Sequence, residues 1–289
     1  MRAALVVASD DPIILALWLR NFAATVGNDV DELLVAVNGP RCHEVVGGMR
    51  MPEPVVEGIP HAGPLVRTWW WPERRDHGWC LQQLYEQTKA DTLLFMETDA
   101  WFRKPGVAGD WLTTVEQGAV DVIGSPRHPG SLEMIHAAIA RWGNITCGED
   151  EGTALWPCFL VASREVLDKT DRHFGARRYE AGEEVPGLRR TFDTPMTDET
   201  MVGVSWQLRD ARAHIRLIRQ RRIAVGSECR IEDSSYFHVG ALSTAFGLAW
   251  GELANADDVL RTPHYELARR FALWHTVADH SPPSTRLDV

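Results

Sequence analysis

Apolar positions follow two rhythms in the first third of the chain, and each rhythm predicts one kind of element. Apolar residues recur with a helical period over residues 12–26, with Gly27 as a stop, and a second helix is expected over residues 79–89. Three runs are apolar throughout and are expected to be strands buried on both faces: residues 3–8, 33–37 and 93–96. Strands joined by helices in this order predict βαβ units and an α/β fold.

The rest of the chain has a mixed pattern. Further strands are expected at residues 65–71, 120–123, 154–162, 215–218, 223–225 and 235–240. Further helices are expected at residues 132–142, 197–213 and 263–278, and a short one after Ser163, whose hydroxyl suits an N-cap. Residues 170–195 carry many charges and glycines without an apolar period, so we expect a mobile loop that closes as a lid.

Composition restricts the class of protein. The chain has 289 residues, of which 45% are hydrophobic and 24% charged, as expected of a globular protein with a sizeable core. A net charge of -10 gives no general attraction to nucleic acid or to anionic lipid. The five cysteines are scattered and form no C-x-x-C pair, so neither a disulfide framework nor a zinc site is expected. We therefore expect a cytoplasmic protein without a membrane span, because no apolar segment is long enough to cross a bilayer.

A pair of acids follows the third of these buried strands. Glu97, Thr98 and Asp99 come directly after residues 93–96, at the carboxyl end of the strand. Open α/β sheets bind their ligands at that end of their strands. Hard divalent cations prefer oxygen ligands, and a cation held there can bind phosphate oxygens in turn. The sequence therefore predicts a metal and phosphate site around Glu97 and Asp99.

This order of elements resembles the GT-A fold glycosyltransferases. The features that carry the resemblance are the βαβ start, the buried strand that ends in acid-x-acid, and the mixed second half. The resemblance implies one catalytic domain over residues 1–245, with a Rossmann-like nucleotide-binding half at 1–102, an acceptor-binding half at 103–245 and a mixed, mainly parallel sheet. Residues 246–289 would be a C-terminal helical extension. It also implies inverting transfer of a sugar to an acceptor hydroxyl from a nucleotide-sugar donor, above all a UDP-sugar, aided by Mn2+ or Mg2+.

The resemblance further implies roles for polar residues at the strand ends. Ser9 and Asp10 follow the first strand, in the loop that touches the nucleotide in the family. The acids Glu97 and Asp99 match the family's D-x-D motif, in which the last acid binds the metal and the first contacts ribose or metal. His238, at the end of a late strand, matches a further metal ligand in many members.

Asn38 is a departure from the family pattern. Family members often have an acid after the second strand that reads the nucleobase, and Asn38 stands at that place here. An amide can hydrogen-bond a base edge, so base recognition is retained while uridine specificity is left open.

Two acids at the start of the expected helix 197–213 are candidates for the catalytic base. In inverting members of the family, a carboxylate in this region takes the proton from the acceptor hydroxyl. Adjacent helical residues point about 100° apart, so only one of Asp198 and Glu199 can face the reaction centre. Asp198 shares a flank with Met201 and Val202, which should face the core and cleft, so Asp198 is favoured and Glu199 is the alternative.

Two other classes of function remain open. A nucleotidyltransferase of similar fold would be expected to have a glycine-rich loop with Lys or Arg after the first strand, and residues 9–11 have neither. A non-catalytic sugar-binding relative would not need Asp99, Asp198 and His238 together. The acceptor is open as well: a glycan or small molecule is expected, while the arginines within residues 209–230 leave a modified DNA base as an alternative.

Overall fold

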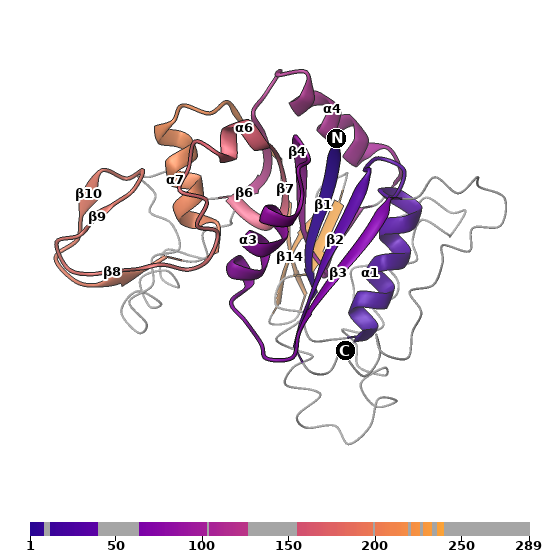
Figure 1. Cartoon of the computed structure of the whole chain (residues 1–289), viewed down its shortest axis with the longest axis horizontal. Coiled ribbons are helices and arrows are strands. Elements are labelled where there is room, and N and C mark those ends of the chain that lie inside the picture. The colour runs from indigo at the N-terminus through magenta and orange to yellow at the C-terminus, as the bar shows by residue number, and fades with distance from the viewer. Residues whose placement is uncertain are drawn as a thin grey trace. The chain divides into compact units, whose positions relative to one another are not determined.

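The computed structural model, drawn in Figure 1, describes residues 1–8, 12–39, 64–102, 104–126, 155–198, 200–218, 221–225, 228–232 and 236–239. The helices are α1 (Pro12–Thr25), α3 (His77–Gln87), α4 (Val107–Glu116), α6 (Arg164–Leu167) and α7 (Val202–Asp210). The main sheet contains β1 (Arg2–Ala8), β2 (Glu32–Asn38), β3 (Leu65–Trp71), β4 (Thr92–Glu97), β6 (Val122–Pro126), β7 (Leu155–Ser163) and β12 (Ile215–Leu217). The smaller sheets contain β5 (Ala100–Phe102), β8 (Arg178–Tyr179), β9 (Glu184–Val185), β10 (Arg190–Thr191), β11 (Met196–Thr197), β13 (Arg221–Val225), β14 (Glu228–Glu232) and β15 (Tyr236–Val239).

The strands of the main sheet lie in the order β12-β6-β7-β4-β1-β2-β3. β2 and β3 are parallel, as are β6 and β12, whereas β6 and β7 are antiparallel. β1 and β4 begin together, since the Thr92 N–H donates to the carbonyl oxygen of Met1 at 3.3 Å. The apolar residues of β1, β2 and β4 are buried, as the wholly apolar runs predicted. The expected α/β class with a mixed, mainly parallel sheet is therefore confirmed.

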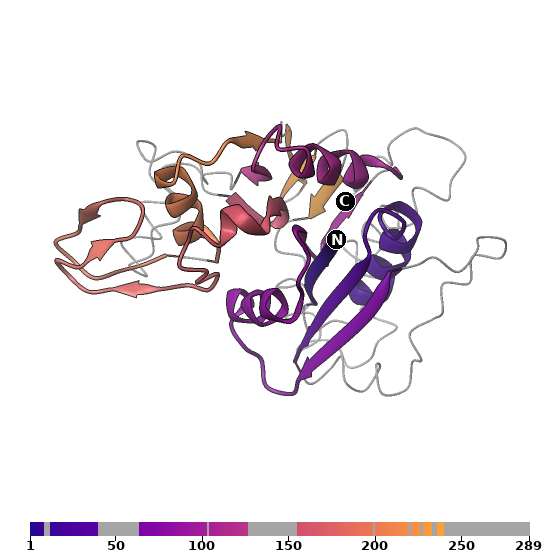
Figure 2. The same ribbon diagram turned by 45° about the horizontal axis from the view of Figure 1, so that its top comes forward.

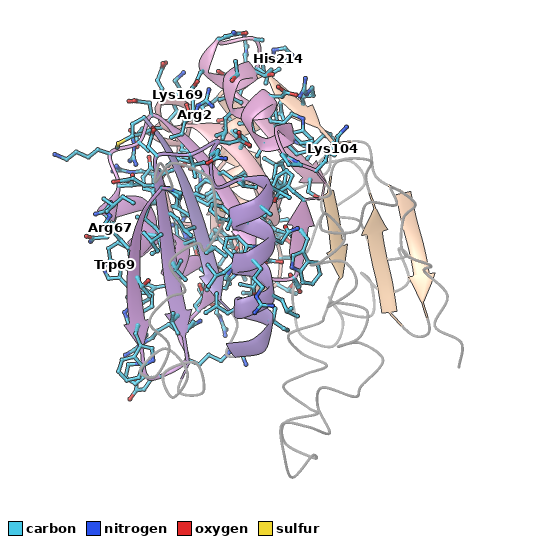
Figure 3. The ribbon with its side chains drawn as sticks, turned by 90° about the vertical axis from the view of Figure 1, so that its right-hand side faces the viewer. Arg2, Arg67, Trp69, Lys104, Lys169 and His214 are labelled. Carbon is cyan, nitrogen blue, oxygen red and sulfur yellow. The ribbon has the colours of Figure 1, made fainter. Side chains whose placement is uncertain are left out.

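β3 forms at the predicted residues, but it is the terminal strand of the sheet and many of its side chains are exposed. Leu65 is 61% exposed and Trp70 39%. Arg67 bonds to Glu32 of β2 at 3.2 Å, and its guanidinium carbon lies 5.5 Å from the ring centre of Trp69 (Figure 3). Charged and aromatic groups therefore cover this side of the sheet, where a central strand would carry aliphatic ones.

The described residues fall into two compact units. The first unit contains the described residues within 1–5, 75–95 and 112–218, and the second contains those within 6–74, 96–111 and 219–289. Each unit is thus assembled from stretches that lie far apart in the sequence, and each has contacts of its own that hold it together.

In the second unit, α1 runs alongside β2 and β3 (Figures 1 and 2) and is bonded to β5. The buried side chain of Asn21 donates to the carbonyl oxygen of Phe102 at 3.0 Å and accepts the Phe102 N–H at 3.1 Å. Asp29 accepts the N–H of Gly109 at 3.0 Å, in the first turn of α4, where the helix dipole favours a carboxylate. These bonds hold β5 and the start of α4, the two elements that follow β4 in the chain.

In the first unit, residues 170–195 are not the irregular loop that their composition predicted. They contain β8, β9 and β10, of which β8 pairs with β11 and β9 with β10 (Figure 1). Tyr179 and Val185 pack in a buried cluster with Val202 and Trp206 of α7. Isolated apolar residues thus build a small core in a stretch without apolar periodicity.

The helix expected from residue 197 begins later than predicted. Met196–Thr197 belong to β11, and α7 starts at Val202. Met201 has φ of 65°, a left-handed conformation that interrupts any helix running through it. The expected burial of one flank is nevertheless confirmed, for Met201, Val202, Ser205 and Leu208.

Most other expected elements form close to their predicted bounds. Ser163 caps α6 as predicted, since its hydroxyl oxygen accepts the N–H of Val166 at 3.3 Å. The elements α4, β5 and β14 were not predicted, and the expected helices at 132–142 and 263–278 lie outside the described residues. None of the helices in the described part of the chain has the length and hydropathy that crossing a membrane would need.

Candidate functional site

The candidate site is centred on the corner between β4 and β5, in the second unit. β4 ends at half-buried Glu97, and Thr98 and Asp99 connect it to β5 with 3% and 7% of their surfaces exposed. The corner forms because the buried residues of β5 return the chain to the core directly after Asp99. Burying an ionised carboxylate costs free energy unless cations or hydrogen-bond donors bind it. Asp99 is therefore not part of a solvated acidic turn, and its burial marks a candidate functional residue.

β15 brings His238 to this corner through its backbone. β15 pairs antiparallel with β5, and the register sets His238 opposite Ala100, the residue that follows Asp99. Opposed residues in antiparallel strands have Cα atoms about 4.5–5.5 Å apart. The structure describes the backbone of β15 and not its side chains, so the register alone places His238 beside the acids.

Asn38 occupies the corresponding place at the end of β2. Its side chain is buried, and Gly39 turns the chain with φ of 138°, a conformation that favours glycine. β1 lies between β2 and β4 in the sheet, and β1, β2 and β3 run the same way (Figures 1 and 3). Ser9 and Asp10, which follow β1, lie outside the described residues.

Asp198 is a buried carboxylate of the first unit and does not open a helix. One carboxylate oxygen, Oδ1, accepts the backbone N–H of Arg177, and the other, Oδ2, accepts the hydroxyl of Tyr179 at 3.1 Å. Burial raises the pKa of the Asp198 carboxyl to about 6, although both hydrogen bonds act to lower it. A group with this pKa can exchange a proton near neutral pH. Glu199, the alternative base, lies outside the described residues.

Arg177 and Tyr179 hold Asp198 in one orientation. The guanidinium of Arg177 pairs with Asp171 at 2.7 Å, and its carbon lies 6.0 Å from the centre of the Tyr179 ring. Burial, and then the charge of Asp198, raise the pKa of Tyr179, so that its hydroxyl stays protonated and can donate. No sequence pattern predicts this network, because Arg177 and Tyr179 are far from Asp198 in the chain and follow no known spacing.

The donor atoms of the corner suit a hard cation. Among the side chains that the structure describes, no group of three or more His, Cys, Asp or Glu residues could hold a metal ion. Glu97 and Asp99 offer carboxylate oxygens, and the backbone of His238 lies opposite Ala100, the residue after Asp99. Carboxylate oxygens are of the donor type that Mg2+ and Mn2+ prefer.

Two tryptophans of β3, Trp70 and Trp71, also belong to this edge of the sheet, although their sequence pattern predicted only a strand. The N–H of Gly39 donates to the carbonyl oxygen of Trp71 at 3.0 Å, and the indole N–H of Trp70 donates to the carbonyl oxygen of Gly39 at 3.1 Å. The run of three tryptophans at the end of a strand was the signal available in the sequence, since aromatic rings commonly line ligand sites.

No protein-family model matches the chain, and no curated protein matches it in sequence. Solved structures of GT-A type glycosyltransferases, the type that the sequence resembles, are similar to it. TarS 1-349 from S. aureus is 10% identical, with a TM-score of 0.46 over 96% of this chain and 71% of that one. Mannosyltransferase PcManGT from Pyrobaculum calidifontis, in complex with GDP-Man and Mn2+, is 11% identical, with a TM-score of 0.44 over 95% and 84%.

A third similar structure covers less of both chains. Glucosyl-3-phosphoglycerate synthase from Mycobacterium tuberculosis, in complex with phosphoglyceric acid, is 17% identical, with a TM-score of 0.40 over 58% of this chain and 58% of that one. Overlaps of this extent do not assign an activity. Any conclusion about function therefore depends on the residues of the site itself.

Proposed function

We propose that this chain is a glycosyltransferase that moves a sugar from a nucleotide-sugar donor to an acceptor hydroxyl with the aid of a divalent cation. The observation that carries the proposal is the buried carboxylate of Asp99 at the end of a central strand, with His238 opposite the next residue. The carboxyl edge of an α/β sheet is where nucleotides bind. In this proposal residues 1–245 form the catalytic domain, with a donor-binding half at 1–102 and an acceptor-binding half at 103–245.

The donor would bind at the corner between β4 and β5. Asp99 and His238 would hold Mn2+ or Mg2+, and Glu97 would bind the same cation or the ribose. When bound, the cation neutralises the diphosphate and makes it a better leaving group. The nucleotide itself, a UDP-sugar in the first instance, would be contacted from the loops after β1 and β2: Ser9, Asp10 and Asn38.

Asp198 is our candidate for the base that takes the proton from the acceptor hydroxyl. With a pKa of about 6 its carboxyl is mostly ionised at neutral pH and can accept that proton. Direct attack of the hydroxyl oxygen on the anomeric carbon forms the new glycosidic bond, breaks the bond to the diphosphate and inverts the configuration. Glu199 is the alternative base.

The experiment that tests the proposal is a screen of nucleotide sugars with Mn2+, with mass detection of the released nucleoside diphosphate. We expect slow hydrolysis of one donor in water and faster turnover with an acceptor. Asp99→Asn should lower this rate by about 10²-fold or more, because a charge-neutralising cation typically contributes several kcal/mol to such a reaction. Asp193→Asn, which makes the same change at an exposed residue of the first unit, should leave the rate unchanged.

The same screen separates the alternatives. A nucleotidyltransferase would consume a nucleoside triphosphate and a sugar phosphate and release pyrophosphate, and a non-catalytic sugar-binding protein would bind without turnover. Glycans, small hydroxyl compounds and DNA with hydroxylated bases then serve as the acceptor panel. If no nucleotide sugar releases its diphosphate, or if Asp99→Asn matches the wild type, the proposal is wrong.

A further inference from the structure

The turn at the end of β2 is fastened to β3 by two tryptophans. Gly39 donates its N–H to the backbone of Trp71 and accepts the indole N–H of Trp70, at 3.0 and 3.1 Å. Both polar groups of the Gly39 backbone are thus bonded to the terminal strand. Because Asn38 directly precedes Gly39, these two bonds also limit the directions in which the Asn38 side chain can leave the backbone.

The pairing of β2 with β3 determines which side chains share a face of the sheet. Asn38 is the register partner of Trp71, so their side chains leave the same face. Trp70 is the partner of Val37 and leaves the opposite face. Its indole N–H nevertheless reaches the carbonyl oxygen of Gly39. Trp70 therefore binds the turn from one face of the sheet, while Asn38 and Trp71 lie together on the other face.

Trp70 contributes little to the core. Its side chain is 39% exposed, whereas Trp18, Trp101 and Trp206 are at most 1% exposed. For these three buried tryptophans the described structure offers no acceptor to the indole N–H. Trp70, by contrast, leaves much of its ring exposed and uses its N–H on the turn. Trp70 therefore stabilises the turn through its hydrogen bond more than through burial of its ring, and this hydrogen bond is the interaction to test.

A fixed amide discriminates between nucleobases in a way that a loose amide does not. The side chain of Asn carries an acceptor oxygen and a donor NH2 group, and rotation by 180° exchanges them. Uracil presents an N–H donor next to a carbonyl acceptor, while cytosine presents an acceptor nitrogen next to an NH2 donor. The buried Asn38 amide can read such an edge only from the position that the turn sets, so a turn that shifts when the Trp70 bond is lost takes the amide out of hydrogen-bond distance of either edge.

We propose that Trp70 is a positioning residue that selects the nucleobase by holding the Asn38–Gly39 turn, with the ring of Trp71 flanking the base. The inference rests on the proposed function, because it takes the ligand to be a nucleoside diphosphate. It adds a prediction about discrimination: the hydrogen bond from Trp70 separates uridine from cytidine diphosphate and leaves the binding of the diphosphate group itself unchanged.

The test compares the binding of UDP, CDP and inorganic pyrophosphate, each with Mg2+, by isothermal titration calorimetry. In Trp70→Phe, which keeps the aromatic ring and removes the N–H, we expect the ratio of the CDP and UDP dissociation constants to move toward one by about fivefold, the factor that one neutral hydrogen bond is typically worth. Pyrophosphate should bind as it does to the wild type. Trp79→Phe is the matched control, since Trp79 is 38% exposed and lies in the first unit.

A second measurement does not depend on the stability of the variant. The indole N–H resonance that Trp70→Phe removes from the ¹⁵N spectrum belongs to Trp70, and in the wild type it should shift with UDP and Mg2+ and stay in place with pyrophosphate and Mg2+. An unchanged UDP to CDP ratio in Trp70→Phe, or a resonance that responds equally to pyrophosphate and UDP, overturns the inference alone. A wild-type protein that binds pyrophosphate but no nucleoside diphosphate overturns the proposed function as well.

Discussion

At the scale of single residues, the buried carboxyl of Asp198 in the first unit gives a pH dependence that can be measured. Its carboxylate is buried and accepts hydrogen bonds from Arg177 and Tyr179, yet burial still raises its pKa to about 6. The ordinary pKa in an unfolded chain is about 3.9. Because the folded pKa is the higher one, folding favours the protonated carboxyl, and this contribution to stability is complete below about pH 3.9 and is lost as the pH rises through 6.

Asp198→Asn should therefore change the pH dependence of stability. The amide is neutral at every pH. The unfolding free energy of the variant should therefore rise relative to that of the wild type between pH 4 and pH 7, by at most about 3 kcal/mol. Chemical denaturation of both proteins across this range measures the difference directly. A difference in unfolding free energy that stays constant with pH would show that the Asp198 carboxyl titrates at an ordinary pKa.

The same substitution tests the role of Asp198 in transfer. Removal of a positioned base typically lowers the rate by about 10² to 10⁴-fold. Asp198→Asn should do so while the affinities for UDP and Mn2+ stay the same, because the proposed donor ligands belong to the second unit. If Glu199→Gln lowers the rate and Asp198→Asn does not, the two residues exchange roles. If neither substitution matters, the base lies elsewhere.

At the scale of elements, the sequence predicted the regular parts and missed the irregular ones. β1, β2 and β4 were found because wholly apolar runs carry their own signal, and α1 because its apolar positions recur with a helical period. Strands of two residues, such as β8 to β11, are too short to show any period. α7 was extended too far toward its N-terminus because acids suit a first helical turn, whereas here Asp198 accepts bonds from β8 and the segment before it.

One packing contact of residues 170–195 gives an element-scale prediction. A methyl group on Gly78, in the first turn of α3, would overlap the carbonyl oxygen of Phe174 and the backbone of Gly175. Alanine is favoured over glycine inside a helix by about 1 kcal/mol, yet overpacking against backbone typically costs about 1–3 kcal/mol. We expect Gly78→Ala to destabilise the protein and to speed tryptic cleavage at Arg177 and Arg178.

The matched control is Gln83→Ala, a change to alanine at a half-buried position of the same helix. It should leave both stability and the cleavage rate nearly unchanged. If residues 170–195 are cut at the same high rate in the wild type, in Gly78→Ala and in Gln83→Ala, the segment is the mobile lid that its composition predicted, and the packing of Phe174 does not restrain it.

At the scale of the whole molecule, candidate residues fall into two groups. Glu97, Asp99 and Asn38 belong to the second unit together with the backbone of His238, and Asp198 belongs to the first. The sequence could predict the first group because acids and amides at strand ends follow from the α/β pattern. It could not predict how Asp198 is held or that Trp70 fastens the Asn38 turn, because both depend on contacts between distant residues.

The central claim is that Asp99 holds a cation which in turn binds a nucleoside diphosphate, and calorimetric titration of UDP tests it most directly. The account predicts binding in the presence of Mn2+, at least tenfold weaker binding in EDTA, and at least tenfold weaker binding to Asp99→Asn in the presence of Mn2+, since the loss of one charged ligand typically costs more than 1.4 kcal/mol. Asp193→Asn should bind UDP as the wild type does. Equal UDP affinity in Mn2+ and in EDTA, or equal affinity of Asp99→Asn and the wild type, would contradict the account.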